Sequence, residues 1–205
     1  MNYIITGIGT DVGKTVASAI IAQALGASYW KPVQAGDLHY SDSMKVDQWT
    51  DEQVSVLPER FLLKQPMSPH AAADIDGISI GLDDFRIPQV DGHLIIEGAG
   101  GLMVPLNTKG LLYIDLFEHW KIPVILISRH YLGSINHTLL SVEALKSRNI
   151  PIEGIFFVGN ENQATESIIL KVTGLKMIGR IPMANEVNST FIQEEAIRIK
   201  PYFKQ

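Results

Sequence analysis

One segment near the amino terminus combines residue types that bind phosphate. The run from Gly7 to Thr15 reads Gly-Ile-Gly-Thr-Asp-Val-Gly-Lys-Thr; it follows an apolar run and precedes a helix-like segment. Glycines let successive backbone N–H groups point at phosphate oxygens, and the amino end of a helix adds partial positive charge. Lys14 can then reach the terminal phosphates of a nucleotide, and the Thr15 hydroxyl can bind Mg²⁺. The segment therefore predicts a phosphate-binding loop.

The start of this loop departs from the common pattern. That pattern has a glycine five positions before Gly13, where Ile8 stands in this chain. The nearest glycines are Gly7 and Gly9, so the loop begins in a different register. The alternative is a tight turn that contains Gly-Lys-Thr by chance. The apolar strand before it and the helix pattern after it favour the phosphate-binding loop.

Three charged residues stand where they could face the same site. Lys31 ends an apolar run beside Pro32, and it is either a surface lysine or a cation aimed at the phosphate site. Glu97 ends another apolar run before Gly-Ala-Gly-Gly, and it is either a Mg²⁺ position or a solvated residue of a glycine-rich turn. Asp42, in Ser-Asp-Ser, is either an oxygen ligand or a helix cap.

Polar residues after two later apolar runs extend the set of candidates. Ser134 and Asn136 open a helix-like segment, whose amino end could bind a carboxylate or could simply be capped by these side chains. Asn160 follows the next run, and its amide could pair with a purine edge or serve only as a turn residue.

The elements that must position these residues alternate between two kinds. Short apolar runs without polar alternation predict strands buried on both faces at residues 3–6, 28–33, 93–97, 124–128, 154–158 and 177–181. Helical patterns lie at residues 16–25, 112–120, 136–147, 164–172 and 190–199. This alternation predicts a three-layer, doubly wound α/β domain with a mainly parallel sheet, which binds ligands at the carboxyl ends of its strands. Residues 35–90 are less regular, and we expect loops and short helices there.

Composition limits the class of protein. The chain has 205 residues, a formal net charge of −5 and no cysteine. We therefore expect one domain without disulfides, thiolate metal sites or nonspecific nucleic-acid binding. The sequence contains no recognisable secretion signal and no apolar run long enough to span a bilayer, so we expect a cytoplasmic protein without membrane contact.

Taken together, the motifs resemble those of the dethiobiotin synthetases, which close the ureido ring in biotin biosynthesis. The Lys31-Pro-Val and Glu97-Gly-Ala-Gly-Gly segments discriminate best, and five residues between the outer glycines of the loop are also a trait of that family. The matching segments span residues 7–15, 31–36, 68–70, 96–101, 132–137 and 179–182, in the order of the family.

The resemblance implies a single ligase domain over residues 1–205 with the fold of the P-loop nucleoside triphosphate hydrolases. Its substrates would be 7,8-diaminononanoate, CO₂ and ATP, with Mg²⁺ as cofactor. One amine becomes a carbamate, ATP phosphorylates the carbamate to a mixed anhydride, and the second amine closes the ring. The family also implies a homodimer whose active sites lie at the subunit interface.

The resemblance also assigns roles to individual residues. It implies catalytic roles for Lys14 and Lys31 and Mg²⁺ ligation by Thr15, Asp42 and Glu97. The implied ATP-binding residues are Gly9, Thr10, Asp11, Val12, Gly13, Lys14, Thr15, Val16, Glu97, Asn160 and Pro182. The implied substrate-binding residues are Thr10, Asp11, Lys31, Ser134, Ile135 and Asn136, the last three reaching the partner's site. Ala35 and Glu161 depart from the residues often found there, which bears on details of the pockets.

Two other functions fit parts of the same pattern. A nucleotide-switch ATPase would share the phosphate-binding loop and a dimer, but it would not need Lys31 or a helix end that binds a carboxylate. An amidotransferase-type synthase domain would act on a larger acid, and the short chain weighs against it. Dependence of ATP turnover on the diamine and bicarbonate separates these alternatives from a ring-closing ligase.

Overall fold

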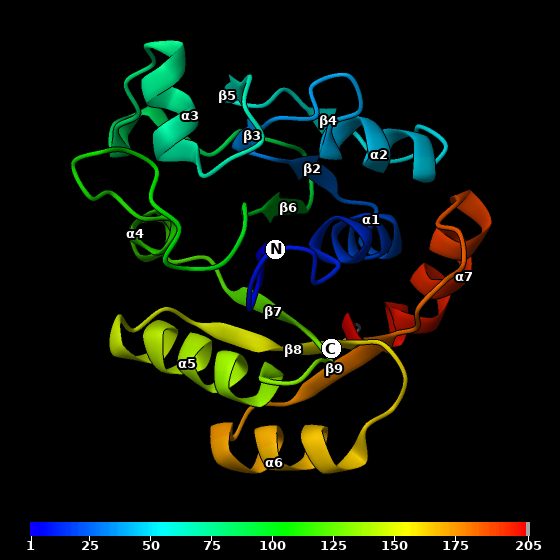
Figure 1. Ribbon diagram of the computed structural model, residues 1–205. Coiled ribbons are helices and arrows are strands. Elements are labelled where there is room, and N and C mark those ends of the chain that lie inside the picture. The colour runs from blue at the N-terminus through cyan, green and yellow to red at the C-terminus, as the bar shows by residue number, and fades with distance from the viewer. Residues whose placement is uncertain (204–205) are drawn as a thin grey trace.

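A parallel β-sheet forms the middle layer of the computed structural model, which describes residues 1–203 of the chain (Figure 1). Every pair of neighbouring strands in the sheet runs parallel. In spatial order the strands are β4 (Val56–Leu57), β2 (Ser28–Trp30), β6 (Leu94–Glu97), β1 (Asn2–Gly7), β7 (Val124–Arg129), β8 (Ile152–Val158) and β9 (Met177–Ile181).

The central strands are apolar on both faces because each face is covered. Ile4, Ile96 and Val124 pair across β1, β6 and β7 and point into one hydrophobic core. Their neighbours Ile5 and Ile95 point into the other core. All five side chains are fully buried, so the continuous apolar runs in the sequence correspond to strands with two buried faces.

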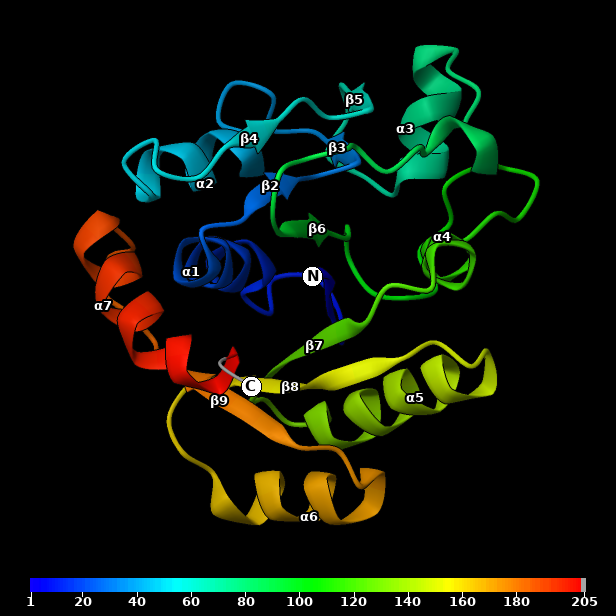
Figure 2. The same cartoon turned by 180° about the vertical axis from the view of Figure 1, so that it is seen from behind.

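Helices form the two outer layers. In both views α1, α2 and α7 lie on one face of the sheet and α4 and α5 on the other, with α6 beside α5 (Figures 1 and 2). This arrangement confirms the predicted three-layer, doubly wound α/β fold. The helices are α1 (Lys14–Leu25), α2 (Asp42–Trp49), α3 (Pro69–Asp76), α4 (Tyr113–Trp120), α5 (Ser134–Ser147), α6 (Gln163–Thr173) and α7 (Ser189–Ile199), with 3₁₀ turns η1 (Leu82–Asp84) and η2 (Lys200–Phe203).

One predicted strand, residues 28–33, is wrong as a single element. The chain leaves the main sheet after Trp30, and β3 (Val33–Ala35) pairs instead with β5 (Phe61–Leu63) in a separate two-stranded sheet. Pro32 lies at the break, where it has no N–H to continue the ladder and restricts the backbone of the residue before it. The break leaves Lys31 between the two sheets.

Residues 35–90 contain more regular structure than the sequence predicts. The short helices α2 and α3 match the expectation, but the strands β4 and β5 were not predicted. These strands have only two and three residues, too short for a clear periodicity. The segment places α2 beside α1, next to the phosphate-binding loop.

The strand order creates a natural ligand-binding edge. From β1 the chain continues to β2 on one side, and later it passes from β6 to β7 on the other side of β1. Ligands bind beyond the carboxyl ends of strands at such a switch point. The loop after β1 is therefore the centre of the expected site.

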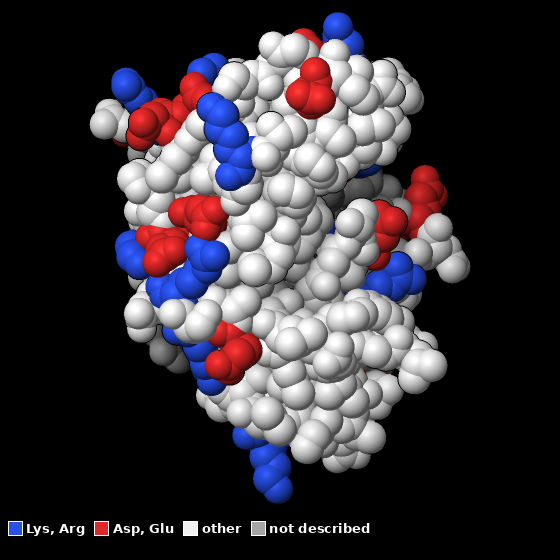
Figure 3. All heavy atoms as spheres, turned by 60° about the vertical axis from the view of Figure 1, so that its left-hand side comes forward, with Lys and Arg blue, Asp and Glu red and all other residues white. Residues whose placement is uncertain are grey.

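The molecular surface mixes charged and uncharged areas. On the face in Figure 3, Lys, Arg, Asp and Glu side chains gather along the left edge and, in smaller number, at the right edge, whereas the area between them is mostly uncharged. Within residues 1–203, no helix is both long enough and apolar enough to cross a membrane.

Candidate active site

The loop between β1 and α1 is shaped by two glycines. A Cβ atom on Gly7 would lie 2.4 Å from the side chain of Val12, so only glycine fits there. Gly13 caps α1 with a φ of 93°, in the left-handed region that glycine adopts without strain. Helix α1 begins immediately afterwards at Lys14, two residues before the expected start, and its amino end faces the loop.

Lys14 folds back over this loop. Its Nζ donates a hydrogen bond to the carbonyl oxygen of Gly9 at 2.9 Å, and only 8% of the residue is exposed. Burial lowers the pKa of Lys14 to about 8, although Glu97 partly offsets this effect. The ammonium pairs with a neutral carbonyl in this state, so a phosphate oxygen is a better partner for it.

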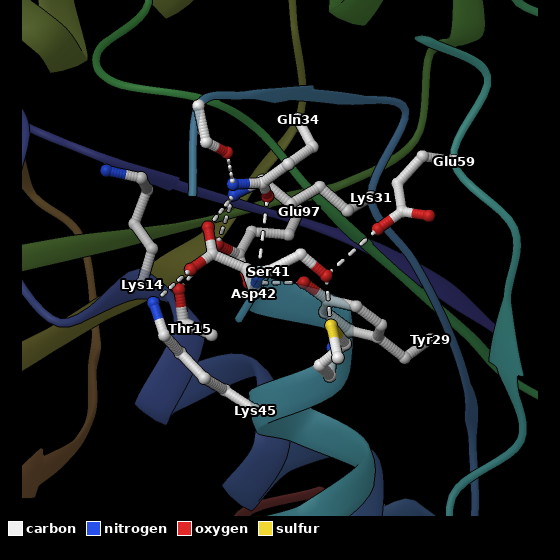
Figure 4. A network of polar contacts seen from close by, with 12 residues as sticks. Lys14, Thr15, Tyr29, Lys31, Gln34, Ser41, Asp42, Lys45, Glu59 and Glu97 are labelled. Carbon is white, nitrogen blue, oxygen red and sulfur yellow. Dashed lines mark hydrogen bonds and ion pairs between the residues drawn. The ribbon is translucent and has the colours of Figure 1, made fainter. Parts of the chain in front are cut away.

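Glu97 is the centre of a buried polar cluster at the end of β6 (Figure 4). Its carboxylate accepts hydrogen bonds at 2.9 Å from the Thr15 hydroxyl, the Tyr29 hydroxyl and the Lys31 ammonium. Glu97 is fully buried, and burial together with this carboxylate raises the pKa of Tyr29 well above its ordinary value. The alternative of a solvated glutamate in a glycine-rich turn is therefore wrong.

Lys31 bridges two carboxylates in the same cluster. Its Nζ bonds to both Glu97 and Asp42, and only 4% of the residue is exposed, which excludes a surface lysine. Burial works against its charge, but Glu97 and Asp42 outweigh burial and raise the pKa of Lys31 above its ordinary value. The break between β2 and β3 places this lysine inside the site.

Asp42 is the first residue of α2 and points into the cluster. Burial disfavours its charge, but Lys31 overcomes this effect and lowers the pKa of Asp42. Ser41, not Asp42, caps the helix, because the Ser41 side chain accepts the N–H of Met44. The alternative of a capping role for Asp42 is therefore wrong.

These residues line a cavity of about 780 Å³. Gly9 and Val12 belong to the loop, but they are not part of the lining, and Val12 is buried beneath it. The other predicted residues of the loop and the cluster all line the cavity: Thr10, Asp11, Gly13, Lys14, Thr15, Val16, Lys31, Asp42 and Glu97.

Two predicted residues, Asn160 and Pro182, do not line this cavity. Both are exposed, and they follow Gly159 and Ile181 at the carboxyl ends of β8 and β9. The N–H of Gly159 donates to the carbonyl of Ile181 at 3.0 Å, which holds the two segments together. A Cβ atom on Gly13 would lie 3.5 Å from Val158, so the end of β8, two residues before Asn160, adjoins the phosphate-binding loop.

The third predicted group lies elsewhere. Ser134 is buried in the first turn of α5, whereas Ile135 and Asn136 are exposed, and none of them lines the cavity. A single copy of the chain therefore brings together the phosphate-binding loop and the Glu97 cluster but not the start of α5.

Sequence reasoning missed three residues of the site. Tyr29 and Gln34 lie on either side of Lys31 in the sequence; the Tyr29 hydroxyl donates to Glu97, and Gln34 Oε1 accepts the backbone N–H of Asp42 at 3.4 Å. Lys45 lies one helical turn after Asp42, lines the cavity and donates to Asp42 at 3.2 Å. The helical spacing of three residues could have identified Lys45 once Asp42 was placed on a helix.

The oxygen donors of the cluster fit a hard divalent cation bound together with phosphate. The Lys31 ammonium lies between the Asp42 and Glu97 carboxylates, and the Thr15 hydroxyl donates to the same Glu97 oxygen. Within residues 1–203, no three His, Cys, Asp or Glu side chains converge on one point. Mg²⁺ suits this donor set, since it binds through one or two carboxylates and completes its shell with water and phosphate.

Comparisons with solved structures identify the fold. A putative plasmid partition protein from Borrelia burgdorferi B31, bound to AMPPNP, superposes with a TM-score of 0.58 at 13% identity, covering 97% of this chain and 96% of that one. The septum site-determining protein MinD of Pyrococcus horikoshii OT3, complexed with Mg-ADP, gives 0.55 at 15% identity, covering 98% and 90%. The chain thus has the fold of the P-loop nucleotide-binding proteins.

Comparisons with sequences of known proteins identify the family of this chain. A family model described as an AAA domain matches residues 1–190. The ATP-dependent dethiobiotin synthetase BioD of Christiangramia forsetii is 52% identical over 200 residues, covering 97% of this chain and 96% of the relative. The enzyme of the same name from Rhodopseudomonas palustris strain BisB18 is 50% identical over 191 residues, covering 93% and 91%. The chain has the phosphate-binding loop and the buried lysine–carboxylate cluster described above, and these relatives show that it belongs to the family of ATP-dependent dethiobiotin synthetases.

Proposed function

We propose that this protein, as a single domain over residues 1–205, closes a ureido ring on 7,8-diaminononanoate with CO₂ and ATP, giving dethiobiotin, ADP and phosphate. The observation that carries the proposal is the buried pairing of Lys31 with Glu97 and Asp42, next to Lys14. A phosphate-binding loop alone suits any nucleotide hydrolase. A second, buried lysine at the same cavity suits a reaction that joins two anions.

The chemistry follows from the charges involved. An amine of the substrate attacks CO₂ and loses a proton, which gives a carbamate anion. The carbamate oxygen then attacks the γ-phosphorus of ATP, ADP leaves, and the second amine attacks the carbonyl carbon and expels phosphate. Carbamate and γ-phosphate repel each other, so cations must hold them in line. Lys14 is placed for the phosphates and Lys31 for the carbamate and the phosphoryl group.

Mg²⁺ is the proposed cofactor, held by Thr15, Asp42 and Glu97 together with the nucleotide. Its charge would neutralise oxygens of the β- and γ-phosphates. Lys31, which pairs with the same two carboxylates in the absence of ligands, would then be available to the reacting anions.

The remaining predicted residues serve the two ends of the substrates. Asn160 and Pro182 are proposed to contact the adenine, since they follow β8 and β9, whose ends are joined by a hydrogen bond, and the end of β8 adjoins the phosphate-binding loop. The loop residues Thr10 and Asp11 are proposed to face the diamine. ATP and small acids are metabolites of the cytoplasm, which is the proposed location.

A homodimer is proposed because the start of α5 lies outside the cavity lining. Ser134, Ile135 and Asn136 would bind the substrate carboxylate in the partner's site through helix N–H groups. Apolar side chains near this helix support a contact surface: Tyr131, Leu132 and Leu140 are all exposed, and Leu132 is completely so. A twofold dimer would then contain two equivalent shared sites.

Product analysis tests the proposed reaction. The protein is mixed with ATP, Mg²⁺, bicarbonate and the diamine, and dethiobiotin and ADP are measured by mass spectrometry. Lys31→Gln should retain ATP binding but lose most ring closure, whereas the exposed Lys171→Gln should behave like the wild type. ATP turnover that does not depend on the diamine would contradict the proposal and favour a nucleotide-switch ATPase.

Mixed dimers test the shared site. Lys31→Gln and Asn136→Ala should each be strongly impaired, because each removes one half of every site. Heterodimers of the two variants should regain activity, since one of their two sites combines an intact Lys31 with an intact Asn136. Heterodimers that form without regaining activity would rule out the shared site.

A further inference from the structure

A second charged network lies at the carboxyl ends of β7, β8 and β9, away from the Glu97 cluster. Its centre is Glu166 on α6, which is only 6% exposed. The Glu166 carboxylate accepts hydrogen bonds from Arg180 Nε at 3.2 Å and Nη2 at 2.6 Å. It also lies 2.9 Å from His130 Nε2 and accepts the backbone N–H of Asn162 at 3.3 Å. None of these groups has a role in the proposed chemistry.

The three partners of Glu166 flank the segments proposed to hold the base. Asn162 follows Asn160 by two positions, and Arg180 precedes Pro182 by two positions. His130 follows β7, and a Cβ atom on Gly159 would lie 3.8 Å from its ring. One carboxylate therefore connects the turn after β8 with the end of β9.

The contacts around this network fix its geometry. A bidentate Arg–carboxylate pair constrains both partners in orientation as well as distance. Arg180 Nη1 also lies 3.8 Å from Glu161, the residue after Asn160. The His130 ring stacks on Phe157 with 5.4 Å between centroids and an interplanar angle of 20°. The hydrogen bonds from Arg180 and His130 outweigh burial and lower the pKa of Glu166, so it is ionised at neutral pH.

We propose that Glu166 is a positioning residue for the nucleotide base, acting through Arg180 and Asn162. It sets the separation between the Asn160 turn and the Pro182 segment, so it controls how well the pocket fits the purine without touching the nucleotide. The proposal rests on the proposed roles of Asn160 and Pro182. It predicts an effect on the base end of ATP that is separable from the phosphate end.

Two ligands that share a phosphate chain separate these ends. The dissociation constants of ATP and of inorganic tripolyphosphate are measured by calorimetry at one Mg²⁺ concentration. Glu166→Gln keeps the size of the side chain but replaces an acceptor oxygen with a donor facing Arg180 and His130. It should weaken ATP binding about tenfold, the cost of one well-placed hydrogen bond, and leave tripolyphosphate binding unchanged. The KM for ATP should rise while kcat at saturating ATP is retained.

Two further variants guard against a general loss of structure. Arg180→Lys keeps the charge but not the bidentate geometry, so it should have the same effect as Glu166→Gln. Glu153→Gln is the matched control, because Glu153 pairs with Lys176 between the other ends of β8 and β9 at 2.6 Å. This control should leave both dissociation constants unchanged.

The possible outcomes distinguish the positioning role from the base site itself. Equal weakening of ATP and tripolyphosphate, or no change in either, would overturn the positioning role. Asn160→Ala tests the underlying assignment in the same assay. If it weakens ATP while Glu166→Gln does not, only the positioning role fails; if it leaves ATP binding intact, the assignment of Asn160 fails and the positioning proposal fails with it.

Discussion

The Glu97 cluster and the Glu166 network both bury a carboxylate next to a cation, but they differ in how completely the charges in them are paired. At Glu97, Lys31 is shared by two carboxylates, and Lys14 next to them bonds only to a backbone carbonyl. At Glu166, the Arg180 guanidinium and the carboxylate satisfy each other directly through two hydrogen bonds. The first arrangement lines a cavity of about 780 Å³.

The difference shows that a buried ion pair can either keep charged residues ready for a ligand or hold parts of the fold together. In the proposed function, Mg²⁺ and phosphates would take over the partners that Lys14 and Lys31 have in the Glu97 cluster, so we expect these pairs to be exchangeable. In the Glu166 network the carboxylate is also held by the backbone N–H of Asn162, and the His130 ring stacks on Phe157, so we expect these pairs to remain when ATP binds. Substitutions in the first region should therefore affect catalysis and the binding of Mg²⁺ and phosphate, and those in the second should affect binding of the base and stability.

The largest effect should come from Lys14. Lys14→Ala removes the cation that follows charge on the phosphates, so ring closure should fall by about a hundredfold or more. Turnover under saturating substrates measures this effect, with Lys171→Ala as the control. A folded Lys14→Ala enzyme with near-normal turnover would show that the Lys14 ammonium does not stabilise the phosphates during the reaction.

The next effect concerns metal binding at Asp42. Asp42→Asn keeps the shape of the side chain but removes a charged oxygen ligand, so the Mg²⁺ concentration for half-maximal activity should rise about tenfold or more. Asp47→Asn is the control, since Asp47 is exposed on the same helix. Equal Mg²⁺ requirements of both variants would remove Asp42 from the metal site.

A smaller effect should follow from Lys45. Lys45 donates to Asp42 at 3.2 Å, and with Mg²⁺ held by Asp42 it would be available to the phosphates. Lys45→Met should therefore weaken MgATP binding about two- to fivefold, in keeping with a partly exposed charge pair. Calorimetry on this variant and on the exposed Lys64→Met measures the difference. Unchanged affinity in Lys45→Met would show that its pairing with Asp42 is only structural.

The smallest effect is a change in the pH dependence of stability at Glu166. Burial alone would raise its pKa, but hydrogen bonds from Arg180 and His130 lower it below the ordinary value of 4.5. The unfolded chain therefore binds a proton at a higher pH than the folded protein does. The resulting stabilisation is present above pH 4.5 and is lost as the pH falls through the lower folded pKa.

Glu166→Gln removes this titration. The free energy of unfolding, measured by urea denaturation between pH 7 and pH about 3.5, should then fall less steeply with acid than in the wild type. Glu153→Gln provides the comparison, because its partner Lys176 is more exposed than Arg180. If the free energy of unfolding of Glu166→Gln fell with acid as steeply as that of the wild type, ionised Glu166 would not stabilise the folded protein through its pairs with Arg180 and His130.

Much of the fold followed from local patterns. Continuous apolar runs identified β1, β6, β7, β8 and β9, and helical periodicity identified five helices within a few residues of their ends. The start of α1 was placed two residues late, because the helix begins inside the glycine-rich motif at Lys14. The strand over residues 28–33 was wrong because an apolar run does not reveal which sheet each half joins.

The site was only partly predictable for a related reason. Lys14 and Thr15 lie in a motif whose spacing carries its own chemistry. Lys31, Asp42 and Glu97 were equally compatible with surface, capping and turn roles, because their neighbours in sequence say nothing about their neighbours in space. Glu166 gave no signal, since an acidic residue in the first turn of a helix is common.

The sequence by itself determined the phosphate-binding loop, the alternation of the main strands and helices, and the family to which the chain is related. Only the tertiary structure decided that Lys31 and Glu97, 66 positions apart, share a hydrogen bond, and that Thr15 reaches the same carboxylate across 82 positions. The physical reason is that loops and helices depend on contacts within a few residues. Buried charge pairs form between strand ends, and the order of strands in the sheet selects which ends meet.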